Sequence, residues 1–149
     1  MTGERPIDDG RCFACGPYAD DGLRMRFEET GVDAVACEVT LPERFQGWRG
    51  VAHGGVVAML LDEGMAYAAA TRGHLGMTAE LKLRFRAPVP LGAPLVVRGR
   101  VEWQRRNVCG VSAEIADASG AVLAAGEGRF VVKGALAPGE RLGRFGDGG

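Results

Sequence analysis

One stretch of the chain, residues 47–70, constrains the fold more than any other. A glycine-rich loop ends in His53-Gly54-Gly55, and the next fifteen positions are almost all valine, alanine, methionine and leucine. This length is typical of a helix rather than a strand, and the apolar residues would occupy every side of that helix instead of one stripe. Other elements must therefore cover the helix all round.

Two carboxylates, Asp62 and Glu63, interrupt this apolar helix. A charge in an apolar setting costs several kcal/mol unless it is paired, hydrogen-bonded or neutralised. Neighbouring residues lie about 100° apart around a helix, so the two acids cannot face one site. We expect one of them to act on a ligand and the other to be salt-bridged or solvated. The alternative is that both are purely structural.

Composition excludes several classes of protein. The 149 residues suit a single domain, and the 46% hydrophobic and 25% charged content is that of a globular chain. A net charge of −1 supplies no field that would hold nucleic acid. The N-terminus lacks the apolar centre of a signal peptide, and no apolar run reaches the roughly 18 residues of a membrane span. We therefore expect a cytoplasmic protein with no membrane or nucleic-acid partner.

The four cysteines raise the questions of disulfides and metal. Without a secretory signal, reduced thiols are the expected state. Cys12 and Cys15 have the spacing of a metal knuckle, but a structural zinc site needs four ligands, and the remaining cysteines and histidines are isolated in the sequence. We therefore expect no metal, and a tight loop with small buried residues at positions 11–17.

Alternating apolar and charged residues predict strands on both sides of the helix. A turn is expected near residues 29–31 and a hairpin turn at residues 117–120. Residues 1–133 are expected to form one domain, followed by a flexible tail at 134–149 without periodicity. We thus expect five to six antiparallel strands, at residues 23–27, 35–41, 79–86, 95–103, 108–116 and 121–132.

A sheet curled around this helix would still leave one flank uncovered. A second copy of the chain could supply the missing layer, so the sequence predicts a homodimer.

The helix start can serve an anionic or carbonyl ligand. Unpaired N–H groups at His53-Gly54-Gly55 and the positive end of the helix dipole suit an oxyanion, or a carbonyl becoming one. The alternative is that the two glycines only allow a tight passage from loop to helix. His53 is a candidate to bind substrate or act as a base, and a hydrogen-bonded scaffold role is its alternative.

Asp62 lies eight residues beyond Gly54. At about 1.5 Å per residue the two are about 12 Å apart along the helix, too far to act on one small reacting centre. If both act, they must come from two chains. Two antiparallel helices side by side would bring the acid of one chain to the helix start of the other.

Residues 50–62, Gly-Val-Ala-His-Gly-Gly-Val-Val-Ala-Met-Leu-Leu-Asp, with the alanine-rich segment after them, resemble the hotdog-fold acyl-CoA thioesterases. The resemblance is to the phenylacetic-acid-pathway (PaaI-like) group within the 4-hydroxybenzoyl-CoA thioesterase superfamily, and it continues through residues 77–92, 117–130 and 12–17. It implies an α+β hotdog fold, in which a curved antiparallel sheet of five to six strands wraps around one long helix. It also implies dimers that often pair into tetramers, and hydrolysis of an acyl-CoA thioester without metal or other cofactor.

The resemblance also implies roles for particular residues. Asp62 would be the general base or nucleophile, and the Gly54 amide of the partner subunit would polarise the thioester carbonyl. His53 would fix the loop or the carbonyl, and Thr78 would help to place the water. The remaining candidates for substrate binding are Gly55, Glu63, Arg84, Arg105 and Arg106.

The arginines are candidates because CoA carries phosphates and a guanidinium group can bind two phosphate oxygens at once. The alternative is that these arginines lie on the outer face of the sheet and are only solvated. The chain departs from its relatives at residues 18–21, where Ala19 stands in place of a common asparagine. The role of that amide is therefore missing here or passes to Asp20 or Asp21.

Two other functions are open on the same residues. One is an acyl-CoA-binding module without turnover. The other is a hydratase or dehydratase of enoyl or hydroxyacyl thioesters, in which His53 and an acid would move the protons.

Overall fold

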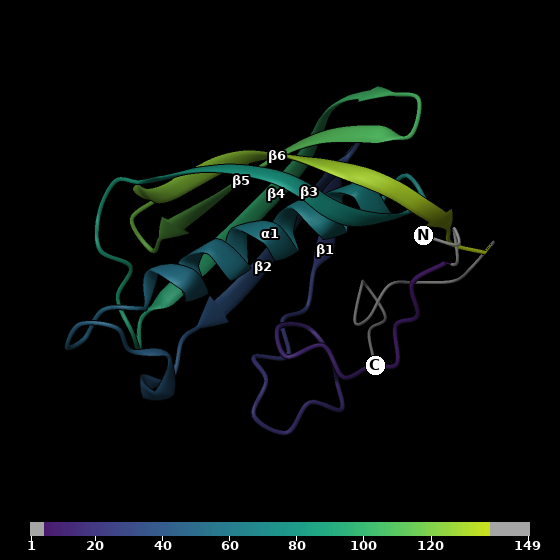
Figure 1. Cartoon of the computed structure of the whole chain (residues 1–149). Helices are drawn as coiled ribbons and strands as arrows, with labels where there is room; N and C mark the ends of the chain where they lie inside the picture. The colour runs from purple at the N-terminus through teal and green to yellow at the C-terminus, as the bar shows by residue number, and fades with distance from the viewer. Residues whose placement is uncertain (1–4, 138–149) are drawn as a thin grey trace.

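The computed structural model describes residues 5–137 (Figure 1). One sheet of six antiparallel strands, in the order β1-β2-β4-β5-β6-β3, arches over a single long helix. The α+β class, the one long helix and an antiparallel sheet within the expected five to six strands are confirmed. Along the chain the elements are β1 (Glu28–Gly31), β2 (Ala34–Thr40), the short 3-10 helix η1 (Glu43–Phe45), α1 (Gly54–Ala70), β3 (His74–Phe85), β4 (Pro94–Arg105), β5 (Val108–Asp117) and β6 (Val122–Ala135).

The helix α1 packs closely on the middle of the sheet. Gly64 lies over β4, where a Cβ added to it would come within 3.1 Å of Val97 Cγ1. A Cβ on Gly99 would collide with the Gly64 carbonyl oxygen, so the two backbones meet at a pair of glycines. This contact fixes which side of α1 faces the sheet. Asp62 and Glu63, the two residues before Gly64, therefore lie beside the surface of α1 that contacts the sheet.

The flank of α1 away from the sheet is partly covered by the N-terminal segment, residues 12–27. The Phe27 ring stacks on the Tyr67 ring of α1 with 4.4 Å between centroids, and Ala14, Cys15 and Met25 are buried in the same core. The sequence alone predicts that a second chain covers this flank. The chain itself supplies part of the cover, and the dimer stays a prediction.

The expected strand at residues 23–27 is wrong. Leu23 and Met25 donate their N–H groups to the carbonyls of Phe13 and Ala14, so this segment is held by the N-terminal loop and not by the sheet. Its alternating apolar residues pack on the helix as an extended segment. The first strand is β1 instead, which places the turn at residues 32–33, two residues later than expected.

The other five strands lie at their predicted positions, and most of their ends differ from the prediction by only one to three residues. β3 begins at His74, five residues before the predicted start, and contains an irregularity between Thr78 and Glu80. β6 continues to Ala135, so the predicted tail from residue 134 begins inside a strand, and its residues 138–149 lie outside the described residues. Within residues 5–137, no helix is both long enough and apolar enough to span a membrane.

Candidate active site

The carboxylate of Asp62 meets the side chain of Thr78. Asp62 is half-buried in the middle of α1, and Thr78 lies on β3 beside the strand irregularity. The Thr78 Oγ1 hydroxyl donates a hydrogen bond of 2.6 Å to Asp62 Oδ1. Among residues 5–137 this is the only polar partner of the Asp62 side chain, so Oδ2 stays available to water or a ligand.

Burial raises the pKa of Asp62 above its ordinary value, and the hydrogen bond from Thr78 opposes that rise. The reason is that the low-dielectric setting of α1 disfavours the charged form, whereas a donated hydrogen bond favours it. The site therefore holds a carboxylate that is a stronger base than one in water and is oriented through one oxygen.

His53 forms the N-cap of α1. Its Nδ1 accepts a hydrogen bond of 2.8 Å from the Gly55 N–H, and its carbonyl accepts from Val56 and Val57. A neutral imidazole that accepts at Nδ1 carries its proton on Nε2. This geometry favours the role of His53 in fixing the loop. Because the Gly55 N–H already donates to His53, it is not available to a substrate, contrary to the expectation from the sequence.

Gly54, unlike Gly55, is not required by the packing of its own chain. A Cβ at Gly55 would lie 3.1 Å from His53 Nδ1, whereas a Cβ at Gly54 would meet no atom within 4 Å. In the described part of the chain the Gly54 N–H has no acceptor, as expected for the first residue of a helix. An open donor with open space beside it is suited to a ligand.

Gly54 and Asp62 do not meet within one chain. Both belong to the uninterrupted helix α1, which separates them by about 12 Å along its axis. His53 and Gly54 are neighbours in the chain. Among the described residues proposed for catalysis, the fold itself brings together only Asp62 and Thr78.

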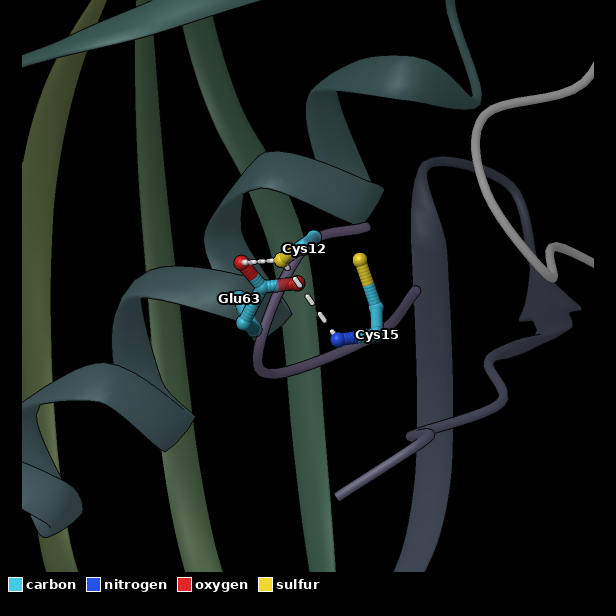
Figure 2. Close-up of side chains that lie close together, drawn as sticks. All are labelled: Cys12, Cys15 and Glu63. Atoms are coloured by element: carbon cyan, nitrogen blue, oxygen red, sulfur yellow. Dashed lines mark hydrogen bonds between the residues drawn. The ribbon is translucent and has the colours of Figure 1, made fainter. Parts of the chain in front are cut away.

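Glu63 faces Cys12 and Cys15 of the N-terminal loop (Figure 2). Its Oε1 lies 3.8 Å from Cys12 Sγ, and no described residue forms an ion pair with it. Burial raises the pKa of Glu63, and the nearby Cys12 adds to the effect. The expectation that the second acid is salt-bridged or solvated is therefore wrong, because its neighbours are thiols.

The two cysteines of the loop influence each other's ionisation. Hydrogen bonding with the Cys15 side chain lowers the pKa of Cys12, while the same contact and burial raise the pKa of Cys15. The Sγ atoms of Cys12 and Cys15 and a Glu63 carboxylate oxygen lie within 4.8 Å of one another. Sequence reasoning missed this cluster because it sought further metal ligands only among cysteine and histidine. The unexplained acid inside an apolar helix was the available signal.

The candidate arginines are divided between two hollows. Arg105 and Arg106 line a hollow of about 580 Å³ at the turn between β4 and β5, together with Trp103 and Arg129. The Arg129 guanidinium lies 5.7 Å from the Trp103 ring centroid. Sequence reasoning missed Arg129 because it lies on β6 and reaches this hollow only through strand pairing.

Arg84 lies apart from these residues. It lines a separate hollow of about 270 Å³ with Lys82 and Arg86. Neither hollow is lined by Asp62 or Gly54.

Known proteins share both the sequence pattern and the fold. A family model described as the thioesterase superfamily matches residues 49–124, which include the helix start, Asp62 and Thr78. Acyl-coenzyme A thioesterase 13 of Homo sapiens and of Pongo abelii are each 28% identical over 95 residues, which cover 62% of this chain and 68% of the relative.

Solved structures agree with this match. The crystal structure of a thioesterase superfamily protein aligns with a TM-score of 0.78 and 34% identity over 82% of this chain and 60% of that protein, so the chain spans less than two thirds of its length. The E. coli PaaI protein from the phenylacetic acid degradation operon aligns with a TM-score of 0.70 and 19% identity, over 76% of this chain and 82% of that one. A Streptococcus mutans UA159 protein bound to acetyl CoA aligns with a TM-score of 0.69 and 18% identity, over 74% and 90%.

The family match covers half of the chain, and the six-stranded sheet over one helix is shared with the solved neighbours. The resemblance drawn from residues 50–62 and the expectation of a thioesterase are thereby confirmed at the level of the family. The chain belongs to the thioesterase superfamily.

Proposed function

We propose that the protein hydrolyses the thioester of an acyl-CoA to a free acid and CoA. The observation that carries this proposal is the half-buried carboxylate of Asp62, oriented through Oδ1 by Thr78 and left open at Oδ2. Membership of the thioesterase superfamily and the likeness to acyl-coenzyme A thioesterase 13 support the choice of substrate class.

In the first form of the mechanism, Asp62 is a general base. Its free oxygen takes a proton from a water molecule, whose oxygen attacks the thioester carbonyl carbon. The tetrahedral intermediate then collapses, the carbon–sulfur bond breaks, and the CoA thiolate leaves and takes a proton. Burial favours this role because a carboxylate with a raised pKa is a better proton acceptor.

In the second form, Asp62 is a nucleophile. Its oxygen attacks the carbonyl carbon directly and the carbon–sulfur bond breaks, so that CoA leaves as the thiolate and takes a proton from solvent. Water then hydrolyses the acyl-aspartyl anhydride, which releases the acid and regenerates the carboxylate. Both forms need the same orientation from Thr78. They also need a donor for the negative charge that develops on the carbonyl oxygen.

We assign that donor to the Gly54 N–H of a partner subunit. The separation of about 12 Å along α1 prevents Gly54 and Asp62 of one chain from serving one thioester. An antiparallel pair of α1 helices would join the two half-sites, and the open space beside Gly54 supports the approach of a ligand there. A homodimer is then the smallest unit with a complete site, and a tetramer would be a pair of such dimers.

We place the CoA phosphates at the hollow lined by Arg105, Arg106 and Arg129. Three guanidinium groups there supply the local positive charge that the net charge of −1 does not. Arg84, which lies in the other hollow, is the weaker candidate.

The proposal is tested by measuring free-thiol release from a panel of aryl, short-chain and long-chain acyl-CoAs with the full chain. Release from at least one member, with equal yield of the free acid, is the expected result. Formation of hydroxyacyl-CoA from enoyl-CoA without free thiol would indicate a hydratase instead. Tight binding without any turnover across the panel would indicate a binding module.

A further inference from the structure

A cluster of potential metal ligands lies where the N-terminal loop meets α1. Figure 2 shows the side chains of Cys12 and Cys15, from the loop, beside the Glu63 carboxylate from the helix. The two Sγ atoms and a carboxylate oxygen all lie within 4.8 Å of one another. Cys15 is buried, and Cys12 and Glu63 are half-buried. The catalytic proposal uses none of these three side chains.

The loop is built to hold the two sulfurs together. The Cys15 N–H donates to Cys12 Sγ at 3.4 Å, and the Gly16 N–H donates to the Cys12 carbonyl at 2.7 Å. A Cβ at position 16 would collide with the Gly10 carbonyl oxygen and the Cys12 nitrogen, so the turn needs glycine there. A backbone N–H directed at a cysteine sulfur orients and stabilises a thiolate ligand.

The spacing of the three groups suits zinc. Bond lengths of about 2.3 Å to sulfur and about 2.0 Å to oxygen place tetrahedral ligands about 3.8 Å apart for two sulfurs and about 3.5 Å apart for sulfur and oxygen. Cys12 Sγ and Glu63 Oε1 are 3.8 Å apart, and the widest separation in the cluster is at most 4.8 Å. Changes of at most about 1.3 Å in these separations would complete the geometry.

The charge of the cluster also lacks compensation from the protein. Glu63 forms no ion pair with any described residue, although it lies in the apolar helix α1. A carboxylate in such a setting is costly without a partner. A divalent cation would supply that partner, and two thiolates select a soft cation over magnesium or calcium.

We propose that Cys12, Cys15 and Glu63 bind one Zn²⁺ ion, with water in the fourth position. Binding displaces the protons that the thiols and the carboxyl group hold in the metal-free protein, and these go to solvent. The ion joins the N-terminal loop to α1 and stabilises the folded state by mass action. It does not contact the thioester, so this site does not depend on the proposed hydrolysis.

The test is metal binding by the full chain, reduced and freed of metal with a chelator. Isothermal titration with Zn²⁺ should give one ion per chain with a dissociation constant at or below about 1 µM. Co²⁺ should produce the near-ultraviolet charge-transfer band of cobalt–thiolate bonds and the visible bands of a tetrahedral site. Added Zn²⁺ should also raise the melting temperature.

The Cys12→Ser and Cys15→Ser variants should weaken Zn²⁺ binding at least about 100-fold, and the isosteric Glu63→Gln variant at least about tenfold. Cys109→Ser removes a buried cysteine outside the cluster and should leave binding unchanged. Circular dichroism identifies any variant that fails to fold, and Glu63→Gln, which preserves side-chain shape, then carries the test.

No Zn²⁺ uptake by the reduced wild-type chain overturns the proposal. Binding that survives in both Cys12→Ser and Glu63→Gln also overturns it. A Cys12–Cys15 disulfide in protein purified without reductant, combined with no uptake after reduction, would assign the pair to redox chemistry instead.

Discussion

Replacing Asp62 with asparagine removes the proposed base and leaves its surroundings in place. The amide oxygen can still accept the 2.6 Å hydrogen bond from Thr78, and the side-chain volume hardly changes. Loss of a positioned general base lowers a rate by about 10² to 10⁴, or ~3 to 5 kcal/mol in transition-state stabilisation. We expect kcat for thiol release to fall at least about 100-fold in Asp62→Asn.

The stability of the same variant shows whether a loss of activity comes from unfolding. Burial raises the pKa of Asp62, which means that the ionised carboxylate disfavours the folded state above its ordinary pKa. A neutral amide does not carry that cost. The melting temperature of Asp62→Asn near pH 8 should therefore equal or exceed that of the wild type, so lost activity cannot be explained by unfolding.

The assay follows free thiol under saturating acyl-CoA, with each variant first checked for its melting temperature. Glu38→Gln removes an exposed carboxylate from β2 and is the matched control. A fall of less than threefold in Asp62→Asn would refute the reasoning and would move the role to Glu63 or favour a binding module.

Three further predictions use the same assays. The kcat/KM of the wild type should fall as the pH is lowered through the pKa of Asp62, because only the ionised carboxylate accepts a proton. This fall should occur at a higher pH than the pKa of an ordinary aspartate. A pH profile of kcat/KM without such a fall on the acidic side would contradict the assignment. His53→Ala should cost about 1 kcal/mol of stability by removing the cap of α1, and His53→Asn should restore most of it, as thermal unfolding would report. Gly54→Ala should lower kcat/KM about tenfold or more with an unchanged melting temperature, because the methyl group enters only the open space beside the N–H; equal activity would exclude Gly54 as the carbonyl donor.

Local patterns accounted for most of the fold. The long, mostly apolar run at α1 and the alternation in β2 to β6 depend only on residues close in the chain, so the type of each element could be predicted from the sequence. The same two-residue alternation led to a wrong prediction of a strand at residues 23–27. An extended segment packed on a helix buries every second residue, as a strand does. The deciding difference is the hydrogen-bond partner, which for Leu23 is the distant Phe13 carbonyl.

The candidate site was only half predictable from the residues. The separation of Gly54 and Asp62 follows from helix geometry alone, and the continuous α1 preserves it. Thr78 was predicted only from the family resemblance. Its hydrogen bond to Asp62 forms because β3 passes beside α1 at an irregular point of the strand. The hollow that joins Arg129 to Arg105 likewise depends on strand pairing.

The sequence by itself determined that this chain builds one apolar helix under an antiparallel sheet, with a donor at one end of the helix and an acid in its middle. Only the tertiary structure decided which way each acid faces. A helix that is apolar on every side carries no stripe to orient it, so its rotation was set by the contact of Gly64 with the sheet. That rotation directs Asp62 to Thr78 and Glu63 to Cys12, and so separates the proposed catalytic carboxylate from the proposed metal ligand.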